Sequence, residues 1–155
     1  MDWLEAVEDE IYNNNIDIVE YNDLSEISMI IKDNEYCEAV SIIINKLKVE
    51  NDRELLVAIS HELGHYNTST YYNPYMLISY KWKMEYEANF DSISRLVPIV
   101  KLEPMLVDGW KCSRYELAEE FHVPEDFIDE AIHMYKRKGL LPERGEEMQK
   151  YEENI

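Results

Sequence analysis

Positive charge is scarce in this sequence of 155 residues. Lysine and arginine together number 15, against 33 aspartates and glutamates, so the formal net charge is −18. A surface this acidic repels phosphate backbones, which argues against direct, non-specific binding to DNA or RNA. The same charge favours encounter with a basic protein partner, because opposite charges speed association.

Cysteine and long apolar runs are scarce as well. Only Cys37 and Cys112 occur, far apart in the sequence, which excludes a framework of disulfides. No apolar run approaches the roughly 20 residues that a bilayer-spanning helix needs. The N-terminal stretch MDWLEAVEDE is acidic and amphipathic, unlike a basic, apolar signal peptide. We therefore expect a cytoplasmic protein that does not bind membranes.

The N-terminal part of the chain has the pattern of one helix followed by a small sheet. Apolar residues at helical spacing predict a helix over residues 1–13. Three segments rich in Ile and Val then predict strands at 16–21, 27–32 and 39–45. Three short strands in succession indicate a small antiparallel sheet.

The rest of the chain has mainly helical periodicity. Helices are predicted by capping residues at their starts and by proline or glycine after their ends, at about 52–66, 79–96, 113–121 and 124–138. The last two have the outline of a helix-turn-helix, over residues 113–138. We expect a single domain over residues 1–139, followed by a polar, flexible tail at 140–155.

The segment His61-Glu62-Leu63-Gly64-His65 places two histidines four residues apart. On a helix these positions share a face, so His61 and His65 can present two imidazoles to one ion. A catalytic zinc has three protein ligands and an open position for water, which Glu62 could reach without being a ligand. Alternatively, two partly buried, hydrogen-bonded histidines at this spacing need no metal.

A third ligand is available on the following predicted helix, which contains Glu85, Glu87 and Asp91. Glu85 and Asn89 share a helical face, where Asn89 could orient either Glu85 or a ligating histidine. Glu87 lies well around the helix from Glu85, so we do not expect both to bind one ion. Alternatively, these acids form a solvated helix face.

Other polar groups give weaker signals. The second helix of the 113–138 pair begins with acidic residues, where a DNA-reading helix would present Arg, Asn or Gln, so we interpret the pair as a packing or partner-docking element. His122 and His133 lack ligand spacing and are expected to be structural or exposed. Five tyrosines lie near the pentad, which is the segment of residues 61–65, and are candidate oxyanion donors. Nothing in the sequence selects one of them: Tyr66, Tyr71, Tyr72, Tyr75 and Tyr80.

The motif HELGHY, followed about 20 residues later by EYEAN and then by RLVP, resembles the ImmA/IrrE family of HExxH metallopeptidases. These are small proteins common in phages, prophages and mobile elements. The resemblance covers roughly residues 16–139 and is most specific at 61–65 and 85–98. One departure is Asp91-Ser92, where family members usually have an aromatic residue followed by Ala.

The resemblance implies that His61, His65 and Glu85 are zinc ligands and that Glu62 is the general base. It favours Glu85 over Glu87, because the family glutamate lies three residues before the Ala of an Ala-Asn pair. The expected fold class is then α+β, with the small three-stranded antiparallel sheet packed on a helical, zincin-like core and with C-terminal helices.

The resemblance also implies a function and a partner. We expect a zinc-dependent endopeptidase in the cytoplasm of a bacterial host cell that cleaves a regulatory partner protein. The expected partner is a helix-turn-helix transcriptional repressor of a phage or mobile element. The alternative is a non-catalytic, acidic protein-binding protein, anti-repressor or antitoxin-like, with a structural or vestigial zinc site. The sequence indicates neither the scissile bond nor the oligomeric state.

Overall fold

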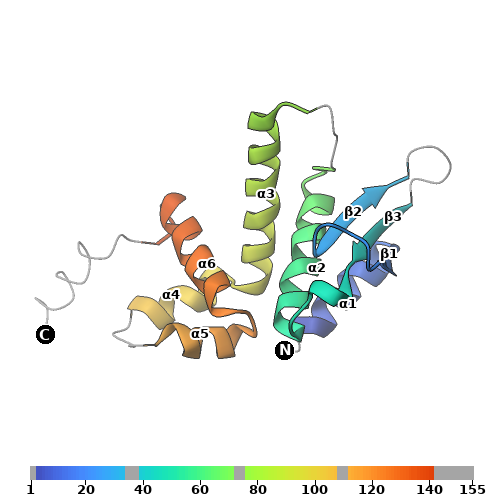
Figure 1. Ribbon diagram of the computed structural model, residues 1–155. Coiled ribbons are helices and arrows are strands. Elements are labelled where there is room, and N and C mark those ends of the chain that lie inside the picture. Colours follow the sequence, from blue (N-terminus) through green and yellow to red (C-terminus); the bar gives the residue numbers. More distant parts are fainter. Residues whose placement is uncertain (1–2, 34–38, 72–75, 108–111, 142–155) are drawn as a thin grey trace, which may run out of the picture. The chain divides into compact units, whose positions relative to one another are not determined.

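The computed structural model describes residues 3–33, 39–71, 76–107 and 112–141 and has an α+β fold (Figure 1). The chain forms two compact units, Met1–Leu96 and Val97–Ile155. The first unit contains α1 (Trp3–Asn13), β1 (Ile16–Glu20), β2 (Ser28–Lys32), β3 (Val40–Ile44), a 3₁₀ turn (Lys46–Lys48), α2 (Asp52–Asn67) and α3 (Ile78–Leu96). The single domain expected over 1–139 and the zincin-like core stay predictions, and 142–155 of the expected tail lie outside the described residues.

The three predicted strands are confirmed, but the prediction that they form an antiparallel sheet was wrong. The order is β1-β3-β2, and Ile42 of β3 faces Ile30 of antiparallel β2 and Ile18 of parallel β1. β3 is almost entirely Val and Ile, which suits the centre of a sheet. β1 carries Asp17 and Glu20, which suit an edge. Because β2 reverses the chain, β1 meets β3 running in the same direction.

Helices α2 and α3 lie side by side (Figure 1). Asn51 caps α2, since its side chain accepts a hydrogen bond from the backbone N–H of Glu54 at 3.0 Å. A Cβ on Gly64 would fall against the carbonyl oxygen of Ala88 in α3 and lie 2.9 Å from its carbonyl carbon. The glycine of the pentad therefore permits a close approach of the two helices that any side chain would prevent.

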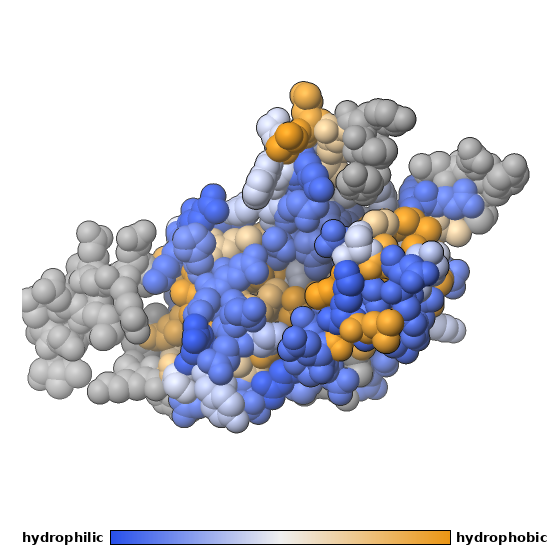
Figure 2. Space-filling model, in the orientation of Figure 1, coloured by the Kyte–Doolittle hydropathy of each residue, from blue (hydrophilic) through white to orange (hydrophobic). Residues whose placement is uncertain are grey.

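Apolar side chains are exposed where α3 begins. Leu77, Ile78 and Trp82 are each about three-quarters exposed, and Figure 2 shows apolar atoms at this end of the helix. Exposed apolar side chains gathered in this way are typical of a contact surface for another molecule.

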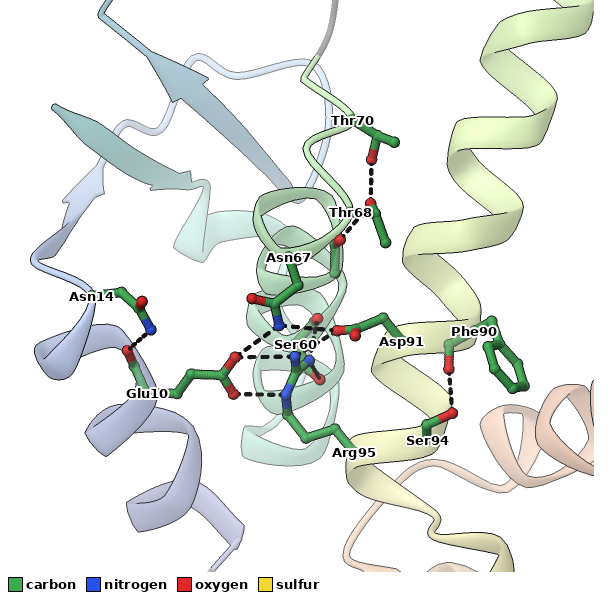
Figure 3. A network of polar contacts seen from close by, with 11 residues as sticks. Glu10, Asn14, Ser60, Asn67, Thr68, Thr70, Phe90, Asp91, Ser94 and Arg95 are labelled. Carbon is green, nitrogen blue, oxygen red and sulfur yellow. Dashed lines mark hydrogen bonds and ion pairs between the residues drawn. The ribbon is translucent and has the colours of Figure 1, made fainter. Parts of the chain in front are cut away.

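An arginine clamp joins the three helices of the first unit (Figure 3). Arg95 of α3 binds both carboxylate oxygens of Glu10 in α1, at 2.8 and 3.2 Å, and Asp91 at 2.5 Å. It also donates to the backbone oxygen and the hydroxyl of Ser60 in α2, each at 3.0 Å. Asp91, where the chain departs from the ImmA/IrrE pattern, is thus part of the clamp. Arg95 is largely buried, so these bonds are shielded from water and salt.

The second unit contains α4 (Ile99–Val107), α5 (Arg114–Phe121) and α6 (Glu125–Arg137). α5 and α6 were predicted, whereas α4 was not. Pro104 lies inside α4, where its missing N–H and its ring disfavour a helix. Leu102 in this helix is nevertheless fully buried, so packing of its apolar side chains outweighs the proline. Among the described residues, none of the helices is both long and apolar enough to span a bilayer.

α5 and α6 are two helices joined by a short turn, within the residues 113–138 for which a helix-turn-helix outline is predicted. His122 ends α5 in the left-handed conformation, with φ of 55°. Arg114 of α5 binds Glu125 at 3.2 Å and also Asp129, both on α6. Two of the acidic residues near the start of α6 are therefore paired with α5, and the role of this helix pair stays a prediction.

Candidate metal centre

Three side chains from α2 and α3 converge on one point. The Nε2 atoms of His61 and His65 lie 3.1 Å apart, and Oε2 of Glu85 lies 3.4 Å and 3.6 Å from them. A tetrahedral zinc about 2.0–2.2 Å from each donor separates its donors by roughly 3.3–3.5 Å. These three residues can therefore hold a metal ion with little rearrangement.

Two side chains of the cluster have shifted pKa values. Burial by itself lowers the pKa of His61, but the hydrogen bond to Glu85 and the charges of Glu62 and Glu85 outweigh it, and this pKa lies above its ordinary value of 6.5. The neighbouring imidazoles of His61 and His65 hold the pKa of Glu85 well below its ordinary value. Glu85 is therefore a carboxylate at neutral pH. It is also the most exposed of the three, with 40% of its side chain accessible.

Both histidines are held by their other ring nitrogen. Nδ1 of His61 lies 2.7 Å from Oδ1 of Asn89, and Nδ1 of His65 lies 2.9 Å from Oγ1 of Thr70. The sequence left open whether Asn89 orients Glu85 or a ligating histidine, and in the structure it contacts His61. Such contacts orient the rings and leave each Nε2 directed at the point where the three side chains converge. Thr70 was not predicted, because it lies in a segment that the sequence indicates only as a polar loop.

Glu62 lies beside the cluster and is only 5% exposed. The hydroxyl of Ser28 donates to its Oε1 at 2.7 Å. Ser28 is the first residue of β2, on the same face of the strand as Ile30. The sheet therefore fixes one oxygen of this buried carboxylate. This contact could not be predicted from the sequence, because Ser28 lies 34 residues before Glu62 and belongs to a strand.

The remaining candidates lie elsewhere. Glu87 pairs with Lys83 at 3.7 Å, one turn earlier on α3, and Asp91 belongs to the arginine clamp. His122 and His133 are exposed residues of the second unit. Within the part of the chain that the structure describes, none of these joins the cluster of His61, His65 and Glu85.

The tyrosines near the pentad have varied surroundings. The hydroxyl of Tyr66 donates to Asn14 at 3.3 Å, and the ring of Tyr71 lies 5.8 Å from the Lys32 ammonium. Tyr80 is exposed. Two further candidates fall outside the described residues: Tyr72 and Tyr75.

Comparison of this chain with protein family models, with curated proteins and with solved structures gave no match. The centre is thus defined by its own geometry. It combines two imidazoles and a carboxylate with a buried glutamate that follows the first histidine in sequence.

Proposed function

We propose that this chain is a zinc-dependent endopeptidase. The observation that carries the proposal is the convergence of His61, His65 and Glu85 at distances suited to tetrahedral zinc. The same donor set also binds ferrous iron in oxygenases, but the buried Glu62 beside it favours hydrolysis. The resemblance of HELGHY and EYEAN to the ImmA/IrrE peptidases supports the same reaction.

The chemistry divides between the ion and Glu62. When bound, zinc supplies a Lewis acid for the scissile carbonyl and lowers the pKa of a water toward neutrality. Glu62 is the group that accepts a proton from the attacking water. Glu62 then delivers this proton to the nitrogen of the leaving amine. Ser28 keeps the carboxylate in place through both transfers.

The position of β2 supports a peptide as substrate. Within the described residues β2 pairs only with β3, so its other edge offers backbone N–H and C=O groups. An extended peptide can add to such an edge as a further strand. Because Ser28 begins this strand and contacts Glu62, a peptide docked there would pass close to the metal centre.

We further propose that the substrate is a helix-turn-helix repressor, on the basis of the family resemblance. The net charge of −18 supports a basic partner, as DNA-binding domains are. The alternative, a non-catalytic binding protein with a structural or vestigial zinc site, is supported by the apolar surface at Leu77, Ile78 and Trp82. That surface would serve either function, so only cleavage separates them.

The experiment is co-expression with a helix-turn-helix repressor encoded next to this chain. We expect the wild type to cleave the repressor and Glu62→Gln to retain zinc but lose cleavage by a factor of about 10² or more. Glu87→Gln is the matched control, since Glu87 lies outside the cluster and should leave cleavage unchanged. Repressor cleavage by Glu62→Gln at the wild-type rate would overturn the mechanism. An intact repressor that binds the wild type would favour the non-catalytic alternative.

A further inference from the structure

A chain of hydroxyl groups connects His65 to the end of its own helix. Nδ1 of His65 lies 2.9 Å from Oγ1 of Thr70, and Oγ1 of Thr70 lies 2.7 Å from Oγ1 of Thr68. The hydroxyl of Thr68 donates to the backbone oxygen of Gly64 at 2.7 Å. Figure 3 shows Thr68 and Thr70 where α2 ends. His65 and Thr70 are both more than nine-tenths buried, so water is largely kept from their contact.

The direction of this chain follows from counting protons. The oxygen of Gly64 can only accept, so Thr68 must spend its one hydroxyl proton on it. Oγ1 of Thr68 therefore accepts from Thr70, whose own proton is then committed. Oγ1 of Thr70 is left as an acceptor, and Nδ1 of His65 must be the donor. His65 thus carries its proton on Nδ1 and an unshared electron pair on Nε2.

The helix end holds Thr70 in place for this role. Ser69 adopts a left-handed conformation with φ of 55°. The backbone N–H of Thr70 then donates to the oxygen of His65 at 2.9 Å, and that of Ser69 donates to the oxygen of Tyr66 at 3.1 Å. This pair of bonds is the Schellman motif that ends many helices. Thr70 is therefore bound to His65 through both its backbone and its side chain.

His61 is held in a different way. Its Nδ1 faces the amide of Asn89, and an amide offers either an acceptor oxygen or a donor NH₂ by turning over. Asn89 can consequently serve either tautomer of His61. The chain from His65 ends on a backbone carbonyl, which cannot reverse.

We propose that Thr68 and Thr70 are positioning residues that set the tautomer of His65 before the metal binds. This inference rests on the zinc site put forward above. The relay, defined as Thr70, Thr68 and the oxygen of Gly64, keeps the proton of His65 off Nε2. It removes the need for His65 to move a proton between its nitrogens when the ion arrives. It also means that a proton between the two Nε2 atoms, 3.1 Å apart, belongs to His61.

The first test reads the tautomer directly, on the full, metal-free chain. Long-range ¹H–¹⁵N NMR should show His65 with a protonated Nδ1 and an unprotonated Nε2. Thr68→Val keeps the hydroxyl of Thr70 but releases its proton, which can then turn toward His65, so this variant should show both tautomers. Wild-type His65 protonated on Nε2, or no change in Thr68→Val, would overturn the proposal. This measurement needs no cleavage and no zinc, so its failure is separate from failure of the proposed function.

The second test measures zinc affinity by competition with a chelator. Contacts to the second nitrogen of a ligating histidine typically contribute about 10–100-fold in metal affinity, and we expect a loss in this range for Thr70→Val. Thr68→Val should lose about tenfold or less, because Thr70 remains. Thr70→Ser and Thr68→Ser keep the hydroxyls and should restore wild-type affinity. Ser69→Gly is the matched control, since it lies between the two threonines and contributes no hydroxyl to the relay.

Wild-type zinc affinity in both valine variants would overturn the relay. If Thr70→Val does not fold, Thr68→Val and the serine variants still decide, because they leave the contact between Thr70 and His65 in place. A wild type that binds no zinc would contradict the proposed function, while the tautomer of His65 would still be measured in the metal-free chain.

Discussion

Ser92 of α3 is a buried hydroxyl whose oxygen has no hydrogen-bond partner within the described residues. Its isolation from water costs free energy that no contact offsets. We predict that Ser92→Ala raises the free energy of unfolding by about 0.5–1 kcal/mol, as measured by urea denaturation. Ser94→Ala, at an exposed position one half-turn further on, is the control and should have little effect. A marked loss of stability in Ser92→Ala would mean that the hydroxyl has a partner.

The raised pKa of His61 predicts how zinc binding depends on pH. A proton on His61 competes with zinc, so zinc affinity should fall as pH drops through this pKa, beginning above 6.5. In the metal-free protein, by contrast, folding stability should fall as pH rises. A pKa that is higher in the folded state contributes stability that is complete below about 6.5 and is lost as pH rises through the folded value.

Thermal unfolding between pH 6 and 8, with and without zinc, measures both slopes. His61→Ala should abolish both, whereas His133→Ala, which removes an exposed histidine of the second unit, should change neither. Equal slopes with and without zinc would show that His61 does not bind the ion.

At the residue scale, local spacing predicts only part of the centre. The four-residue separation of His61 and His65 indicates a shared helix face, because helix geometry is the same in every helix. Distinguishing Glu85 from Glu87 depends on which face of α3 meets α2, and the family resemblance supplied that choice. Thr70 could not be predicted, because its place depends on a left-handed residue that is normally glycine and is serine in this chain.

At the element scale, the centre depends on how closely α2 and α3 approach. We predict that Gly64→Ala forces the helices apart, since the added Cβ meets backbone atoms of Ala88 that cannot rotate away. The expected cost is about 1–3 kcal/mol of stability together with a large loss of zinc affinity, because Glu85 moves with α3. Chemical denaturation and chelator competition measure the two effects. Ala58→Gly, a change on the same helix away from this contact, should lower stability but spare zinc binding.

The sheet shows where prediction of elements stops. Each strand could be predicted from its own Val and Ile content, whereas strand order depends on a competition among all three. The apolar β3 takes the centre, which leaves the more polar β1 and β2 at the edges. The same limit explains α4, whose Pro104 opposes a helix locally but is outweighed by the burial of Leu102.

At the scale of the whole molecule, zinc should stabilise the first unit by joining α2 to α3. A ligand at about 1,000 times its dissociation constant contributes about 4 kcal/mol to the folded state. We predict that chelation lowers the Tm of the wild type by several degrees, as measured by calorimetry, and that re-addition of zinc restores it. Glu62→Gln keeps all three ligands and should show the same shift. An unchanged Tm after verified zinc removal would contradict a site within the folded unit.

Whether His61, His65 and Glu85 bind zinc is decided by the metal content of the purified protein. We expect one zinc per chain in the wild type, the same in Glu87→Gln, and little or none in Glu85→Gln and His61→Ala. The paired glutamates make the comparison sharp, because they lie two residues apart on α3 and only Glu85 reaches the histidines. A folded wild type without metal, or a Glu85→Gln variant that retains its zinc with unchanged affinity, would contradict the account.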